Sequence, residues 1–256
     1  MTTAIIDTHT HLCDAVFDED RDQVLQRARV AGVGSIVLVG EDLRDARANL
    51  ELAKQYPMLK PAAGLYPGIL DQDQANALGN FIRENRVDLV AIGEVGLDHW
   101  IVKQPDEKEV QAFIFKTFIH LSREVDLPLN VHSRSAGRKV VELLLAEGGQ
   151  KVQLHAFDAK ASTALPAVEA GYFFSIPPSI VRSRQKQKLV KALPLDAMLL
   201  ETDSPVLGPD PKERNELANI SLVVEAIAQI KNVSPEDVIE VTVENTRKLY
   251  GDRIVG

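Results

Sequence analysis

Near its N-terminus the sequence reads Ala4-Ile5-Ile6-Asp7-Thr8-His9-Thr10-His11, a short apolar run that ends in two histidines. This pattern is typical of a β-strand. Side chains alternate between the two faces of a strand, so His9 and His11 point the same way, with Asp7 on the same face. Two such imidazoles can bind one metal ion, although a pair of exposed, hydrogen-bonded histidines would give the same pattern. The interpretation therefore depends on whether ligand-type residues also end other strands.

Short aliphatic runs recur along the chain and alternate with longer amphipathic segments. Their periodicity predicts eight strands, each followed by a helix. The expected strands lie near residues 4–9, 35–39, 61–65, 89–93, 128–131, 152–154, 172–176 and 198–200. The clearest helices are expected near 18–31, 42–56, 72–85, 106–125, 136–146, 182–191, 219–231 and 235–249. In the long fourth helix, Phe113 and Phe118 are expected on the apolar face.

This alternation indicates an α/β fold, and its length fits a (β/α)8 TIM barrel, with a doubly wound open sheet as the alternative. Six ligand-type residues distinguish the two folds. They stand at or just past the ends of predicted strands 1, 4, 5, 6 and 8: His9, His11, Glu94, His132, His155 and Asp203. In a closed barrel these strand ends meet at one rim, whereas an open sheet would spread them apart. We therefore expect the barrel.

Four imidazoles and two carboxylates provide enough donors for two divalent ions, especially if Glu94 bridges them with its two oxygens. Ions about 3.5 to 4 Å apart can hold a shared hydroxide and bind both the attacking and the leaving oxygen of an ester. Asp203 would bind one ion, take the proton of the water, or both. Glu94 and Asp203 are thus the expected catalytic carboxylates. The donor set suits Zn, Mn, Fe or Ni better than Mg.

Composition limits the partners of the chain. Its 256 residues, 45% of them hydrophobic, are enough for one barrel domain over residues 1–256. The formal net charge of −8 argues against a broad basic surface, although a local basic patch in a cleft is allowed. The single cysteine, Cys13, excludes an internal disulfide, and neither a signal peptide nor a membrane-spanning stretch is apparent. We expect a cytoplasmic protein without membrane contact or an obligate protein partner.

Five motifs closely resemble, in order and spacing, the signatures of the TatD family of metal-dependent deoxyribonucleases. They are DTHTH at 7–11, GEVGLD at 93–98, VHSR at 131–134, LHAF at 154–157 and ETDSP at 201–205. Residues 130–138 and 171–179 look nearest to a eukaryotic-type branch of that family. The resemblance covers nearly the whole chain and implies a (β/α)8 barrel of the metallo-dependent hydrolase superfamily.

The resemblance also implies roles for the candidate residues. By motif position, one ion belongs to His9, His11, Glu94 and Asp203, and the other to Glu94, His132 and His155. Family members are associated with hydrolysis of DNA phosphodiesters, often from the 3′ end, so the implied substrate is DNA, as single strands or 3′ ends. Many amidohydrolase relatives place a carboxylated lysine on the fourth strand, but Leu89 to Asp98 contains no lysine. This favours phosphoester cleavage over amide-ring hydrolysis.

The chain departs from the family pattern in three places. Tyr66 stands where the G-x-H-P motif commonly has histidine, the segment 155–159 lacks the usual glycine after the histidine motif, and Leu217 replaces the proline of the R-N-E-P motif. None of these departures changes a proposed ligand. The departures therefore bear on the substrate more than on the metal.

Other residues allow two interpretations each. Arg134 could hold a substrate phosphate with its planar guanidinium or form a salt bridge that shapes the rim. The basic run at 182–188 could steer a polyanion, but a solvated helix face is the simpler explanation. Trp100, the only tryptophan, could stack on a base, although packing against the neighbouring loop is the simpler expectation.

Two functions other than phosphodiester hydrolysis stay open. One is a non-catalytic metal-binding scaffold, which the acidic balance and the altered Tyr66 and Leu217 motifs allow. The other is a metal-dependent hydrolase of a small amide or lactone, since related barrels perform such reactions.

Overall fold

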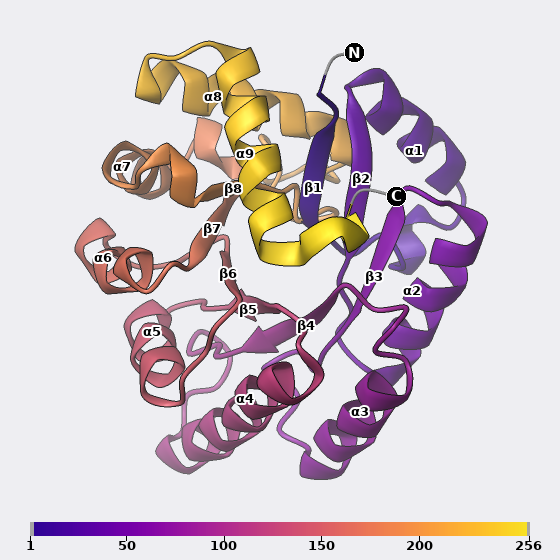
Figure 1. Cartoon of the computed structure of the whole chain (residues 1–256), viewed down its shortest axis with the longest axis vertical. Coiled ribbons are helices and arrows are strands. Elements are labelled where there is room, and N and C mark those ends of the chain that lie inside the picture. The colour runs from indigo at the N-terminus through magenta and orange to yellow at the C-terminus, as the bar shows by residue number, and fades with distance from the viewer. Residues whose placement is uncertain (1–2, 255–256) are drawn as a thin grey trace.

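The protein is a ring of strands surrounded by helices, as the computed structural model in Figure 1 shows for residues 3–254. Its strands are β1 (Ile5–Thr10), β2 (Val33–Leu38), β3 (Leu59–Ala63), β4 (Ala91–Gly96), β5 (Leu129–His132), β6 (Val152–His155), β7 (Phe173–Ile176) and β8 (Met198–Leu200). The α-helices are α1 (Arg21–Val30), α2 (Leu43–Gln55), α3 (Gln72–Glu84), α4 (Pro105–Val125), α5 (Gly137–Ala146), α6 (Ala161–Glu169), α7 (Arg184–Ala192), α8 (Ile220–Lys231) and α9 (Pro235–Tyr250). Short 3-10 helices are η1 (Ala15–Phe17), η2 (Pro178–Val181), η3 (Leu195–Ala197), η4 (Leu217–Asn219) and η5 (Gly251–Ile254).

The strands are parallel and pair in sequence order from β1 to β8. Other hydrogen bonds join β8 and the segment after it to β1 and so close the ring. The Thr8 hydroxyl donates to the Leu200 carbonyl oxygen at 2.9 Å, and the Asp203 N–H donates to the His9 carbonyl oxygen at 2.9 Å. The predicted (β/α)8 barrel is therefore confirmed, and the open doubly wound sheet is not formed.

Local sequence signals set several helix starts. The Asp42 side chain caps α2 by accepting the Asp45 N–H at 2.9 Å. At the start of α9, Ser234 and Asp237 form a reciprocal capping box. Each cap satisfies N–H groups that have no partner within the helix, which explains why both helices begin where the sequence predicts.

A cluster of apolar side chains closes one end of the barrel. It contains Ile6, Val37, Val39, Ala62, Val90, Ala91, Leu199, Val243, Leu249, Tyr250 and Ile254. The Ser35 hydroxyl, near the start of β2, donates to the Ile254 carbonyl oxygen at 2.6 Å. Figure 1 shows α9, in yellow, crossing the barrel in front. The C-terminal segment thus covers the amino-terminal ends of the strands and leaves their carboxyl ends as the open mouth.

Strand β4 extends beyond its expected end at Gly93. Its pairing with β5 continues through Val95 opposite Val131 and Gly96 opposite His132. Gly96 has φ +145°, and a Cβ atom there would lie 2.1 Å from the His132 carbonyl oxygen. Only glycine allows this close approach. Glu94 therefore lies inside the strand, beside β5, rather than just past its end.

Phe113 is a correction to the predicted apolar face of α4. Its side chain is 59% exposed, whereas Phe118 on the same helix is fully buried. Helical periodicity identifies residues that share a face, but the width of that face depends on the neighbouring helices.

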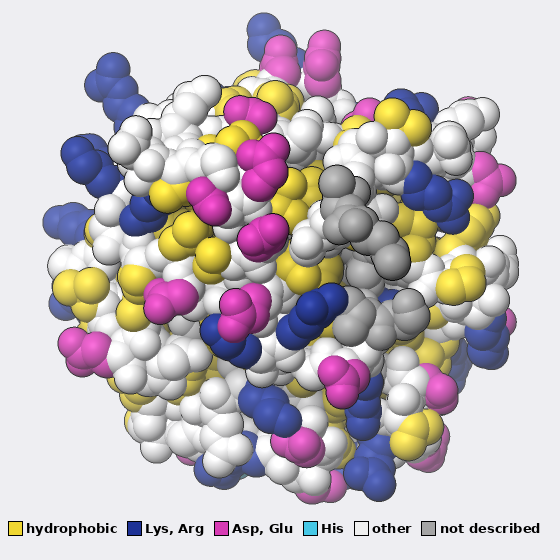
Figure 2. Space-filling view, turned by 45° about the horizontal axis from the view of Figure 1, so that its top comes forward, with side chains coloured by type: hydrophobic (Ala, Val, Ile, Leu, Met, Phe, Trp, Pro, Cys, Tyr) yellow, Lys and Arg dark blue, Asp and Glu magenta, His cyan; other side chains and the backbone are white. Residues whose placement is uncertain are grey.

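The surface mixes both signs of charge. Figure 2 shows lysine and arginine side chains scattered among acidic ones over the face in view, without a broad basic area on it. Between residues 3 and 254, no helix has both the length and the apolar character that crossing a bilayer requires.

We predict that Phe118→Ala lowers the free energy of unfolding by about 3 to 5 kcal/mol, because it leaves a cavity between α4 and the barrel. Phe113→Ala, a matched change on the same helix, is expected to stay within about 0.5 kcal/mol, since its side chain is exposed. Urea denaturation of both variants measures the difference. Equal losses would contradict the packing described for α4.

Candidate active site

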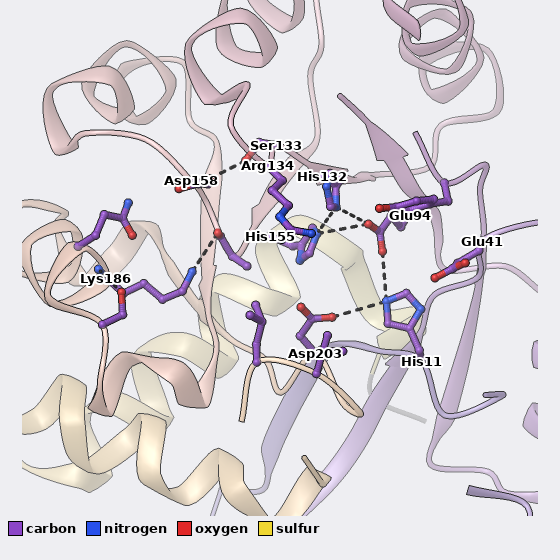
Figure 3. A pocket seen from close by; sticks show the side chains of 16 residues that line it. His11, Glu41, Glu94, His132, Ser133, Arg134, His155, Asp158, Lys186 and Asp203 are labelled. Carbon is purple, nitrogen blue, oxygen red and sulfur yellow. Dashed lines mark hydrogen bonds and ion pairs between the residues drawn. The ribbon is translucent and has the colours of Figure 1, made fainter. Parts of the chain in front are cut away.

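Residues from both ends of the chain meet at the open mouth of the barrel (Figure 3). His9 and His11 extend from β1, and their Nε2 atoms lie 3.3 Å apart. Asp203 Oδ1 lies 3.4 Å from His9 Nε2 and 3.5 Å from His11 Nε2. Glu94 Oε2, from β4, lies 3.5 Å and 3.2 Å from the same two nitrogens. Four donor side chains thus point at one centre.

The second carboxylate oxygen of Glu94 faces another pair of histidines. Oε1 lies 2.5 Å from His132 Nδ1 and 3.6 Å from His155 Nε2. The His155 ring stacks on the His9 ring, with centroids 3.8 Å apart. The structure therefore brings all six predicted donors together, with Glu94 between two sets. Their role as metal ligands stays a prediction.

Asn130 fixes the orientation of His9. Its Nδ2 donates to the Thr8 carbonyl oxygen at 2.9 Å, which places its Oδ1 2.8 Å from His9 Nδ1. His9 Nδ1 must therefore donate its hydrogen to Asn130. In the neutral imidazole, Nε2 then presents a lone pair to the centre of the site.

Asp98 fixes the orientation of His132. Its Oδ2 lies 3.0 Å from His132 Nε2, so that His132 Nδ1 faces Glu94. Asp98 is itself held by the N–H groups of Trp100 and Ile101, at 2.8 and 2.9 Å, and by the Tyr66 hydroxyl at 3.2 Å. A carboxylate that binds the outer nitrogen of a histidine is a common support for a metal ligand.

These contacts fit a divalent cation. In their neutral forms, His9 and His132 direct lone pairs at buried carboxylate oxygens, and such pairs repel unless a cation or a proton lies between them. Two groups of donors are close enough to share an ion, His9 with His11 and Asp203, and His9 with Glu94 and His155. Mixed imidazole and carboxylate donors suit Zn, Mn, Fe or Ni.

The pKa values of the site residues describe the site when protons rather than metal ions lie between the histidines and the carboxylates. Burial acts to lower the pKa of His11, but hydrogen bonds with Asp203 and Glu94 raise it to about 9. Burial acts in the same direction on His132, and the charge of Glu94 together with the Asp98 hydrogen bond raises its pKa to about 9. Burial and the charge of His9 lower the pKa of His155 to about 4. Burial opposes ionisation of Glu94, yet the charge of His132 and the surrounding hydrogen bonds hold its pKa well below the usual range.

Sequence reasoning missed several residues that support the donors. Asn130 precedes His132 by two positions on the same face of β5, and Asp98 closes the GEVGLD motif, so both had a local signal. Glu201 follows β8 directly and accepts the Ala156 N–H at 2.9 Å and the Ser175 hydroxyl at 2.6 Å. Burial raises the pKa of Glu201 to about 7. Its contacts hold the start of the loop after His155.

The site opens into a cavity of about 640 Å³. Arg134 and Lys186 are among the residues that line it. Arg134 forms no ion pair with any carboxylate of residues 3–254, which contradicts the salt-bridge alternative. The expectation that the 182–188 run is mostly a solvated helix face is confirmed, since none of its residues is buried. Lys186 is the member that turns inward, and its Nζ donates to the Ala156 carbonyl oxygen at 3.0 Å. Figure 3 shows Lys186 reaching towards the site from α7.

Two of the departures from the family pattern have structural explanations. Besides its bond to Asp98, Tyr66 packs edge-on against the His132 ring, with centroids 5.6 Å apart. Leu217 is fully buried in the apolar core. Neither residue displaces any of the six donors.

Comparison with known proteins gives a consistent result. Residues 6–251 match the family described as TatD related DNase. Among curated relatives, Deoxyribonuclease TATDN3 of Homo sapiens is 46% identical over 96% of this chain and 94% of its own length. The "Uncharacterized metal-dependent hydrolase YabD" of Bacillus subtilis is 32% identical over 96% of this chain and 98% of its own. The "3'-5' ssDNA/RNA exonuclease TatD" of Erwinia tasmaniensis is 29% identical, with coverage of 96% and 99%. A solved structure, the TatD homologue YJJV of Escherichia coli, aligns with a TM-score of 0.89 and 27% identity over 98% of this chain and 99% of that one.

We predict that Asp98→Asn lowers the affinity for a transition-metal ion by about 10- to 100-fold, because it weakens the support of His132. Competition with a chelating dye measures this affinity. Asp126→Asn, a matched change at the exposed end of α4, serves as the control and should leave the affinity unaltered. A loss of similar size in both variants would refute the role of Asp98.

We also predict that metal binding releases protons at pH 7. Because the pKa values of His11 and His132 are about 9 in the metal-free protein, both imidazoles carry protons at pH 7 and a bound cation must displace them. The affinity therefore weakens as the pH falls below about 9. Titration calorimetry in buffers of different ionisation enthalpy counts the protons, and a count of zero would exclude these histidines as ligands.

Proposed function

Because the chain belongs to the TatD related DNase family, we propose that it is a metal-dependent deoxyribonuclease that hydrolyses phosphodiesters of single strands or 3′ ends, acting in the 3′-to-5′ direction. The observation that carries this proposal is the position of Glu94, whose two oxygens face two separate sets of histidines in a buried site. That arrangement serves a pair of cations better than a single one. The names of the relatives, which include deoxyribonuclease and exonuclease, support the substrate.

We assign the donors to two ions. His9, His11, Glu94 and Asp203 would hold one, and Glu94, His132 and His155 the other. Bound divalent ions supply a water of lowered pKa and stabilise negative charge on phosphate oxygens. The chain supplies the rigid frame, because Asn130 and Asp98 orient two of the histidines before any ligand binds.

Asp203 is the group that we assign to proton transfer. Burial acts to raise its pKa, but hydrogen bonds with His11 and His9 bring the pKa below its usual range, so the carboxylate is ionised at neutral pH. Oδ1 faces the histidines, and the residue lines the cavity where substrate would bind. The carboxylate would accept the proton of the attacking water.

Arg134 and Lys186 would hold the substrate. Both line the cavity, and an arginine guanidinium can donate two parallel hydrogen bonds to phosphate oxygens. Together they balance the negative charge that a DNA strand brings to the mouth of an otherwise acidic protein.

We predict that Asp203→Asn and His132→Ala each reduce nuclease activity by orders of magnitude, about 10²- to 10⁴-fold, while the fold survives. The assay follows cleavage of end-labelled single strands with Mn, Mg or Zn, and circular dichroism checks the fold. His120→Ala is the control, since His120 is exposed and its ring faces Glu147, away from the site.

The outcome also separates this proposal from a non-catalytic scaffold. Cleavage that a chelator abolishes and added metal restores excludes the scaffold. Full activity in either site variant, or cleavage that persists after chelation, would refute the assignment of the site.

A further inference from the structure

A second hollow lies outside the site just described, between α4 and α5. This outer groove has a volume of about 680 Å³ and is lined in part by His99, Lys108, Phe113, Lys116 and Lys139. The groove thus combines three lysines with Phe113, which is 59% exposed, on a chain whose formal net charge is −8. The groove therefore has the chemistry of a site for a polymer that carries planar bases and negatively charged phosphates.

Two of these lysines are free to bind a ligand. Within residues 3–254, neither Lys108 nor Lys139 forms an ion pair, whereas Lys116 pairs with Glu147 at 2.8 Å. Burial and the charge of Lys108 lower the pKa of His99, Lys139 adds to this effect, and the charge of Asp98 opposes it, as expected for two lysines that line the same groove as His99. Glu109 also lines the groove, so the site is basic but not uniformly so.

Trp100 lies beside residues of both cavities, since His99 of the outer groove precedes it in the chain and Arg134 of the active-site cavity lies over its ring. Trp100 is 57% exposed, so the expected packing against the neighbouring loop covers only part of the side chain. The guanidinium of Arg134, a lining residue of the cavity, lies 5.1 Å from the ring centroid, and Lys103 Nζ lies at the same distance. His99, which lines the outer groove, donates its N–H to the Arg134 carbonyl oxygen at 3.0 Å.

The Trp100 backbone is also fixed in place. Its N–H donates to Asp98 Oδ1 at 2.8 Å, and the other oxygen of Asp98 binds His132. The two cations lie over the indole ring. An exposed indole on a fixed backbone is suited to stacking on a nucleobase when these cations turn to the adjoining phosphates.

We propose that Trp100 and the outer groove bind the stretch of single-stranded DNA that extends away from the phosphodiester held in the active site. One base stacks on Trp100, a further base contacts Phe113, and phosphates bind Lys108 and Lys139. This inference rests on the proposed nuclease function, since it assigns the path of the same substrate. If the DNA follows this path, the affinity of the protein for single-stranded DNA depends on the length of the DNA.

Trp100 itself provides the first test. It is the only tryptophan, so intrinsic fluorescence of the full-length protein reports on this one position. Phosphorothioate oligothymidylates, which resist hydrolysis, are the probes. We expect a 12-mer to quench the fluorescence to saturation and a dinucleotide to leave it unquenched at the same nucleotide concentration.

Variants provide the second test. Trp100→Ala is expected to weaken binding of the 12-mer on the order of 10-fold, and Trp100→Phe should restore most of this loss. In the double variant Lys108→Gln and Lys139→Gln, the salt dependence of binding should fall by about one unit of slope per lysine. Lys248→Gln on α9, at the opposite end of the barrel, is the matched control for charge.

Measurements of turnover distinguish the proposed role of the outer groove from the proposed nuclease function. The substitutions at Trp100, Lys108 and Lys139 should reduce kcat/KM for the 12-mer phosphodiester at least about fivefold more than for bis(p-nitrophenyl) phosphate, which cannot reach the groove. Equal losses on both substrates, or a 12-mer that leaves Trp100 unquenched while the small diester is cleaved, would overturn the groove and leave the nuclease proposal standing. Quenching and weakened binding without cleavage of any diester would support the groove and refute the nuclease.

Discussion

Closure of the barrel at the junction of β1 and β8 is the constraint on which the site depends. There the Asp203 N–H donates to the His9 carbonyl oxygen and the His11 N–H donates to the Ser204 carbonyl oxygen, at 2.9 and 2.8 Å. Asp7 strengthens the same junction by accepting the backbone N–H and the hydroxyl of Thr202, 195 positions away. These bonds place the first and last donors of the site in contact. An open sheet would leave the two halves of the donor set apart.

Burying so many ionisable groups is unfavourable unless each is paired. Here the histidines and carboxylates lie in contact with one another, and residues behind two of the rings satisfy their outward-facing nitrogens, as Asn130 does for His9 and Asp98 does for His132. These two supports fix the direction of both rings, whereas His155 Nδ1 has no hydrogen-bond partner among residues 3–254. Because these supports belong to the packed barrel, they hold the ring nitrogens that would contact a ligand in fixed positions.

The sequence allowed the barrel and the meeting of six ligand-type side chains at its mouth to be predicted, because strand alternation and strand ends are local properties. It did not reveal the role of Asn130, which depends on Thr8 and His9 across the barrel. Nor did it show that Phe113 and Trp100 are exposed, since exposure depends on which neighbours cover a side chain. Lys186 was missed for a similar reason, because a run of charges does not indicate which member turns inward.

The C-terminal cover formed by α9 and η5 has a consequence for how a polymer would be handled. Because the apolar cluster around Tyr250 closes the end of the barrel opposite the site, no DNA strand can pass through the middle of the barrel. Substrate would enter and product would leave through the same open mouth of the barrel. In the proposed exonuclease, a mononucleotide product would leave through the same opening by which the shortened strand advances, so the rate of successive cleavages would depend on product release. Contacts that retain the remaining polymer would have to lie outside this opening.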